Sequence, residues 1–119
     1  MHNTAEDIQR LEAKLRDHQK LLAAVGDETR LRLICLLLRG ACSGSRVVEL
    51  ARQANLSRPA VSRHLHVLKD AGVVKDRREG TCIYYYLDPE DQEITALAEL
   101  LDDMLRILRR APDRQGEQD

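Results

Sequence analysis

Four polar side chains recur at spacings of four, four and three along one expected helix: Arg58, Ser62, His66 and Lys69. On an α-helix this spacing places all four on one stripe, to one side of the apolar core face. Arginine and lysine reach phosphates or guanine edges, and serine hydrogen-bonds to either. Ser57, just before the helix, and Arg63, beside the stripe, extend this polar surface. The stripe suits contact with duplex DNA in the major groove; the plainer alternative is a solvated face of an amphipathic helix.

A second basic group follows this helix directly. Lys75, Arg77 and Arg78 precede an expected turn at Glu79-Gly80, and the β-branched and aromatic segment 81–87 reads as a return strand. Cations beside the turn of a hairpin are what a wing needs in order to touch the DNA backbone or the minor groove. Because the two basic groups adjoin, together they favour DNA binding over the solvated-face alternative.

The elements that would position these groups are indicated by turn and capping residues. Segment 46–69 reads as a short helix, a turn and a second helix, because Asn55 tolerates the left-handed backbone of a tight turn. Ser57 is the expected N-cap of the second helix, with Pro59 in its first turn. The apolar residues expected between the helices are Val47, Leu50, Ala51, Leu56, Val61, Leu65 and Leu68. This is a helix-turn-helix pattern, and segment 73–87 would be its wing.

Two outer segments carry apolar residues in a heptad pattern. The first is an expected continuous helix over 4–25, capped by Thr4 and ended by Gly26, and the second is an expected helix over 90–110. In one small domain, such apolar stripes are expected to have no partner within the chain. Both helices are therefore predicted to form a homodimer interface, and the alternative is that they pack within one chain. The residues expected at this interface are Leu11, Leu15, Leu22, Leu97, Leu101 and Leu108.

The composition restricts the class of protein. The 119 residues, 43% of them apolar and 33% charged, suit a single globular domain over 1–119, with a frayed polar tail at 112–119. The net charge of −1 hides a basic stretch over 56–78 and an acidic stretch from Asp88 onward, which favours a local anion-binding face. Three tyrosines are the only aromatic residues, which disfavours a single-strand binder built on scattered stacking platforms.

The compartment and the chemistry are restricted as well. No apolar run is long enough to span a membrane, and the N-terminus lacks the pattern of a signal peptide. Three cysteines without such a signal indicate a reducing, cytoplasmic setting rather than a disulfide scaffold. No catalytic triad, phosphate-binding glycine loop or catalytic carboxylate pair stands out, so the sequence predicts a protein that is not an enzyme.

Several of these segments together resemble the ArsR/SmtB winged-helix repressors. They are GDETRLRLI at 26–34, VELA at 48–51, LSRPAVSRHL at 56–65, LKDAGVV at 68–74 and RREGTCIYYYL at 77–87. The resemblance spans roughly 21–108 and implies a winged helix-turn-helix in the order α-α-α-α-β-β-α, mainly helical with a small β-hairpin. It also implies a homodimeric repressor, joined through its first and last helices and released from a palindromic operator by a metal ion or thiol modification.

The signal that would release the protein is the least determined part of this resemblance. Many members carry a Cys-x-Cys pair before the recognition helix, where this chain has Arg46 and Val48. Others place metal ligands on the last helix, where Asp91 and Glu93 match one half-site but Met104 and Ile107 occupy the other. Two carboxylates without facing imidazoles make a poor zinc or nickel site, so their plainer interpretation is acidic residues in a first helical turn.

The thiols offer the other route to a signal. Cys35 lies in the apolar run 33–38, where a buried cysteine serves as a small apolar side chain. Cys42 lies in a Gly/Ser loop, and Cys82 lies across the wing turn from Arg77 and Arg78, whose charge would favour a thiolate. Cys42 and Cys82 are the candidate thiol sensors, with two inert thiols as the plainer interpretation. The expected effector is a metal or metalloid ion or a thiol-modifying agent.

A second function is compatible with the same fold. A winged helix can serve as a protein–protein interaction module, with the acidic tail and the outer helices as its contact surface. In that case the stripe from Arg58 to Lys69 would be dispensable, and duplex DNA would bind weakly or not at all.

Overall fold

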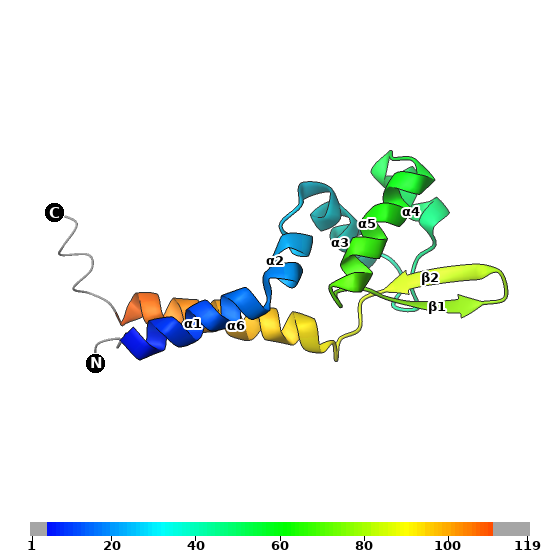
Figure 1. Cartoon of the computed structure of the whole chain (residues 1–119). Helices are drawn as coiled ribbons and strands as arrows, with labels where there is room; N and C mark the ends of the chain where they lie inside the picture. Colours follow the sequence, from blue (N-terminus) through cyan, green and yellow to red (C-terminus); the bar gives the residue numbers. More distant parts are fainter. Residues whose placement is uncertain (1–4, 111–119) are drawn as a thin grey trace.

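The computed structural model describes residues 5–110 and shows a helical chain with one two-stranded antiparallel sheet (Figure 1). The elements are α1 (Ala5–Asp17), α2 (Gln19–Val25), α3 (Glu28–Arg39), α4 (Val47–Ala54), α5 (Arg58–Asp70), β1 (Lys75–Glu79), β2 (Cys82–Tyr86) and α6 (Gln92–Arg109). This order confirms the winged helix-turn-helix fold, with one more helix than the sequence predicted. Thr4, the expected first cap, and the expected tail at 112–119 lie outside the described residues.

The apolar core lies where α2, α3, α4 and α5 meet, and Tyr85 of β2 packs into it. The side chains of Leu33, Leu50, Val61, Leu65 and Leu68 are fully buried there. Complete burial of one such side chain stabilises the fold by about 1.5–3 kcal/mol. We call the region from α2 to β2 the body of the molecule.

The helix-turn-helix has the expected ends. Asn55 ends α4 in the left-handed conformation, with φ 55° and ψ 48°. The Ser57 hydroxyl caps α5 by accepting a hydrogen bond of 3.2 Å from the backbone N–H of Ala60. Gly72, at φ +82°, turns the chain from α5 toward the wing. These local signals hold α5 at a fixed angle to α4.

The wing is joined to the loop between α3 and α4 by a contact that the sequence did not predict. β1 begins at Lys75 rather than Val73, and its register with β2 runs from Lys75 opposite Tyr86 to Glu79 opposite Cys82. The loop at 40–45 was expected to be irregular, but Ser45 pairs with Tyr85 through two backbone hydrogen bonds of 2.8 and 2.9 Å. The loop therefore forms a one-residue β-bridge with β2, and this bridge fixes the base of the hairpin.

The expected continuous helix over 4–25 is wrong, because the chain bends at His18 (φ −112°, ψ 21°). Before the bend, α1 lies alongside α6 and runs in the opposite direction (Figure 1). After the bend, α2 buries Leu21 and Ala24 in the body. Both segments have an apolar face, so the heptad pattern continues through the bend while the two faces meet different partners.

We call the pair of α1 and α6 the arm, because it projects from the body (Figure 1). Within the arm no residue of α1 is buried, and Leu100 is the one buried residue of α6. The helix expected over 90–110 begins two residues later, at Gln92, and Asp91 caps it by accepting from the backbone N–H of Ile94. None of the helices in the described part of the chain has the length and apolar character needed to cross a bilayer.

Candidate nucleic-acid interface

The polar stripe of the sequence lies on the outer surface of α5. Ser57, Arg58, Ser62, Arg63, His66 and Lys69 are all exposed, whereas Val61, Leu65 and Leu68 fill the core behind them. Serine and arginine side chains therefore project from the first two turns of α5. In helix-turn-helix proteins, these turns of the second helix contact base edges in the major groove.

Three of the expected DNA-binding cations are engaged within the chain. Lys69 pairs with Asp76 of β1 at 2.9 Å, and Lys75 pairs with Asp88 at 2.8 Å. Each carboxylate raises the pKa of its lysine. Arg77 contacts Glu79 at 3.3 Å, with its guanidinium 4.7 Å from the centre of the Tyr84 ring. These ion pairs would have to open before the cations could contact phosphate.

The remaining cations are free to meet DNA. Among residues 5–110, no carboxylate forms an ion pair with Arg58, Arg63 or Arg78. Arg58 and Arg63 lie on the first two turns of α5, and Arg78 is exposed near the tip of the wing. The sequence did not show which cations are free and which are paired. The acidic partners lie on β1 and in the segment before α6, and only the fold brings them to the cations.

Two features of this surface were missed by the sequence reasoning. Arg46, just before α4, lines a small cleft of about 230 Å³ together with Arg58 and Cys82. Val67 is 42% exposed and lies with Asp70 on the outer surface of α5, beside Arg63. The helical period could have placed Val67 outside the core, because it lies six residues from Val61.

A network of polar contacts fixes α5 against the helices behind it. Arg30 donates from Nε to the carbonyl of Ala24 at 2.7 Å and lies 3.4 Å from Nδ1 of His64 on α5. Asp27 caps α3 by accepting from the backbone N–H of Arg30 at 3.0 Å, and this hydrogen bond holds the pKa of the Asp27 carboxyl below its usual value. Arg30 thus joins the end of α2, the start of α3 and the recognition helix.

The cysteines differ from their expected settings. Cys35 is exposed rather than buried, because α3 lies at the surface and turns only Leu33 and Leu37 fully inward. Cys82 lies opposite Glu79 in the hairpin register, not opposite the wing arginines. Cys42 lines a cavity with Tyr86 at the far end of β2. Cys42 and Cys82 line different cavities, and both thiols are free.

The candidate metal ligands do not form a site within one chain. Asp91 is 4% exposed, and its carboxylate is engaged as the cap of α6. The side chain of Glu93 lies against Gly72, where the chain leaves α5. Within residues 5–110, no three His, Cys, Asp or Glu side chains gather closely enough to bind a metal ion. The donor set therefore does not fit a zinc or nickel centre in the single chain.

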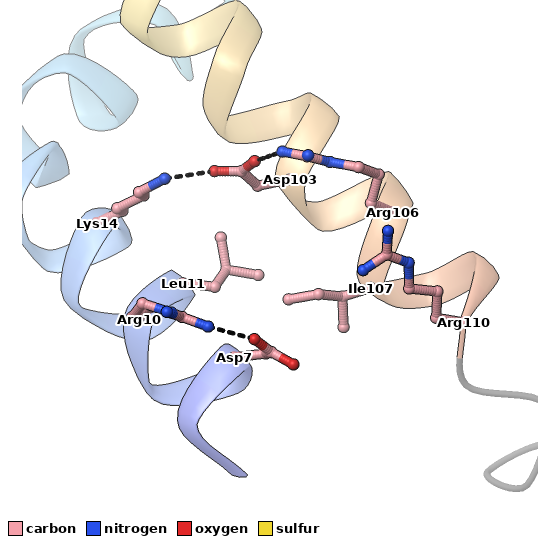
Figure 2. Close-up of a pocket in the computed structure, with 8 residues that line it drawn as sticks. All are labelled: Asp7, Arg10, Leu11, Lys14, Asp103, Arg106, Ile107 and Arg110. Carbon is pink, nitrogen blue, oxygen red and sulfur yellow. Dashed lines mark hydrogen bonds and ion pairs between the residues drawn. The ribbon is translucent and has the colours of Figure 1, made fainter. Parts of the chain in front are cut away.

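The residues expected at a dimer interface fall into two groups. Leu11 faces Ile107 of α6 across a cleft in the arm, beside the Lys14–Asp103 ion pair of 2.7 Å (Figure 2). Leu15, Leu22 and Leu97 are also half-buried within the chain. In contrast, Leu101 and Leu108 are 54% and 59% exposed. The arm thus packs partly within one chain and partly faces outward.

A helix-turn-helix followed by a two-stranded wing defines the winged helix-turn-helix fold. This fold is typical of DNA-binding transcriptional regulators, and the free arginines of α5 suit that class. A family model described as bacterial regulatory protein, arsR family, matches residues 27–76. The chain is 46% identical over 88 residues to the HTH-type transcriptional regulator Rv2034 of Mycobacterium tuberculosis, covering 74% of this chain and 75% of that protein. The chain belongs to the arsR family of bacterial regulatory proteins.

Two further relatives extend this comparison. The chain is 43% identical over 68 residues to the arsenic resistance transcriptional regulator ArsR1 of Pseudomonas putida, covering 56% of this chain and half of ArsR1. The fold matches the solution structure of the homodimeric winged helix-turn-helix DNA-binding domain Mb0332 from Mycobacterium bovis. That match has a TM-score of 0.59 and 25% identity, and it covers 87% of this chain and 91% of the other.

Proposed function

We propose that this chain is a non-enzymatic, cytoplasmic repressor that binds a palindromic double-stranded operator as a homodimer. The observation that carries the proposal is the free basic surface formed by Arg58 and Arg63 on α5 with Arg78 on the wing. Ser62 lies between the two helix arginines and adds a hydroxyl that can read a base edge. A dimer bound across a promoter would repress transcription by occupying it.

The homodimer has two supports. The similar Mb0332 domain is described as homodimeric. The arm of this chain also leaves Leu101 and Leu108 exposed on one side of α6. Two recognition helices related by a two-fold axis can bind two half-sites about one helical turn apart, which is the reason to expect a palindrome.

The test is a selection of operator fragments from the genome that encodes the chain, followed by titration at two salt concentrations. We expect Arg58→Ala to relax base preference and to cost about 1–3 kcal/mol in affinity. Arg39→Ala, an exposed arginine at the end of α3, is the matched control and should leave binding unchanged. Unchanged affinity and base preference in Arg58→Ala would contradict the proposal and favour the protein–protein interaction module.

The signal that releases the operator is proposed to enter through sulfur. The cleft that contains Cys82 also contains Arg46 and Arg58, so an adduct on that thiol would crowd the start of α5. Cys42 lines the separate cavity at the junction of the wing with the arm. Wild type, Cys42→Ser and Cys82→Ser should be challenged with As(III), persulfide and peroxide while bound to operator. If both variants release DNA as readily as wild type, the sulfur route is wrong.

The metal route is tested on the same complex. If Asp91→Ala combined with Glu93→Ala abolishes release by nickel or zinc, a site completed between two chains replaces the sulfur proposal. The Asp91 change also removes a helix cap, so circular dichroism should first show that the double variant is folded.

A further inference from the structure

The small cleft beside Arg46 is formed by three elements of the body. Arg46 lines it from the start of α4, Arg58 from the start of α5, and Thr81 and Cys82 from the wing. These elements meet because α4 packs against both α5 and β2. We call this space of about 230 Å³ the arginine cleft, since the side chains of Arg46 and Arg58 are both exposed at its edge.

The charge of the arginine cleft is positive and unbalanced. Among residues 5–110, no carboxylate lines the cleft and none forms an ion pair with Arg46 or Arg58. Glu79, which lies opposite Cys82 in the hairpin, contacts Arg77 instead at 3.3 Å. Two like charges beside one cleft repel each other, and an anion between them removes that repulsion. The cleft therefore favours an anion as its occupant.

Other groups of the arginine cleft can donate hydrogen bonds to such an anion. No side chain caps the start of α4, so the backbone N–H groups of Val47 and Val48, at the cleft wall, have no acceptor within the helix. The dipole of α4 adds a partial positive charge at the same end. The exposed hydroxyl of Thr81 is a further donor on the wing side. Donors on three sides suit the oxygen atoms of a phosphate group.

We propose that the arginine cleft binds one phosphate group of the operator backbone. This inference rests on the proposed function and adds a contact outside the polar stripe of α5. A water molecule takes up about 30 Å³ of liquid, so a cleft of about 230 Å³ has room for a phosphate group. The guanidinium of Arg58 carries several donors in a planar fork, so it can hold the phosphate with one edge and reach a base with the other.

The contact has a consequence for how the protein lies on DNA. Phosphate contacts position a protein on the duplex, whereas base contacts read the sequence. The arginine cleft joins α4, α5 and the wing, so one phosphate bound there fixes all three elements relative to the backbone. Arg46 is therefore a positioning residue for the recognition helix rather than a reader of bases.

Arg46→Ala tests this role. We expect operator affinity to fall about tenfold for each bound copy of the chain, with base preference unchanged. The slope of log affinity against log salt should fall by about one for each copy. Arg46→Lys should restore most of the slope and only part of the affinity, because it keeps the charge and loses the planar fork. Arg52→Ala, at an exposed arginine in the last turn of α4, is the matched control and should change neither quantity.

A scan of the operator backbone identifies the phosphate. Each phosphate is replaced in turn by a neutral methylphosphonate, and affinity is measured for wild type and Arg46→Ala. We expect a position at which the replacement weakens wild type about tenfold and hardly affects Arg46→Ala, because its partner is already missing. Elsewhere the two proteins should respond alike. Additive effects at every position, or wild-type affinity and slope in Arg46→Ala, would overturn the inference.

Inorganic phosphate tests the arginine cleft without DNA. In a titration followed by nuclear magnetic resonance, the backbone amide signals of Val47, Val48 and Thr81 should shift and saturate. Arg46→Ala should lose these shifts, and Arg52→Ala should keep them. Shifts that spread over the basic surface without saturation would show an adventitious ion only and would contradict the site.

The two experiments separate this inference from the proposed function. If wild type binds the operator but no phosphate is coupled to Arg46, the arginine cleft is wrong and the repressor proposal stands. If wild type binds no operator fragment while inorganic phosphate still gives saturable shifts, the repressor proposal is wrong, and the phosphate that the cleft binds is not that of an operator.

Discussion

The body of the molecule buries the side chains of Leu33, Leu50 and Leu65 completely, whereas the arm buries only Leu100 of α6 and no residue of α1. The core of the body is formed by four helices together with Val73, Val74 and Tyr85, and Leu97 of α6 packs against it. The arm has one packed side, between α1 and α6, and one exposed apolar side. The difference indicates two sources of stability: the body is held by its own core, and the arm by its one packed side together with the dimer contact proposed above.

The charges follow the same division. On the body, the free arginines of α5 lie on a surface with no apolar stripe, which suits reversible contact with phosphates and base edges. On the arm, Lys14 of α1 and Arg106 of α6 both pair with Asp103 of α6 (Figure 2). The ion pairs of the arm thus include one that joins α1 to α6 within one chain, whereas Arg58 and Arg63 of α5 have no ion-pair partner among residues 5–110.

The largest expected effect comes from a charge in the exposed stripe of the arm. Leu101→Glu would place two unpaired carboxylates in the dimer interface, at a cost of about 3–5 kcal/mol for each. We expect a monomer whose body is still folded and whose operator binding is lost. Sedimentation and circular dichroism measure both parts. An unfolded Leu101→Glu protein would contradict the division, because the body should not need the arm.

The next largest effect should come from the core of the body. Leu65→Ala removes a fully buried side chain and should lower the free energy of unfolding by about 2–5 kcal/mol. The same loss should appear in the Leu101→Glu background, because the two sites belong to different regions. Urea unfolding of the single and double variants measures this, and a strongly non-additive result would show that body and arm unfold together.

The sequence predicted the body better than the arm for a physical reason. The signals in the body are local: Asn55 turns the chain and the Ser57 hydroxyl meets a backbone N–H three residues away. The bend at His18 has no such signal, since neither glycine nor proline marks it. It arises because Leu21 packs into the core while α1 packs on α6, and a heptad pattern does not state which partner each turn will meet.

The site shows the same limit. Helical period alone placed Arg58, Ser62 and Arg63 correctly on one exposed surface of α5. The partners of Lys69 and Lys75 could not be predicted, because Asp76 and Asp88 reach them only through the fold of the wing. The pairing of Ser45 with Tyr85 joins residues 40 positions apart, and glycine and serine near Ser45 indicated only a loop.

A smaller effect should distinguish the free cations of the wing from the paired ones. Arg78→Ala should lower the slope of log affinity against log salt by about one, because a free phosphate contact releases one counterion. Lys75→Ala should lower it by less, since Asp88 already neutralises that lysine within the chain. Equal slopes for the two variants would show that the Lys75–Asp88 ion pair opens on DNA.

The smallest expected effect is on the ion pair that joins the two helices of the arm. Lys14 lies 2.7 Å from Asp103 and is the main cause that holds the pKa of this carboxyl below its usual value. A lowered pKa in the folded state stabilises the fold above the ordinary titration range of aspartate. The contribution is lost as the pH falls from about 4 through the folded pKa. Since Lys14 is 55% exposed, the pair should contribute no more than about 1 kcal/mol. Asp103→Asn should therefore be slightly less stable than wild type at pH 7 and equally stable near pH 2, as measured by urea unfolding. A difference that persists at low pH would mean that Asp103 acts through its shape rather than its charge, and would contradict this account of the ion pair.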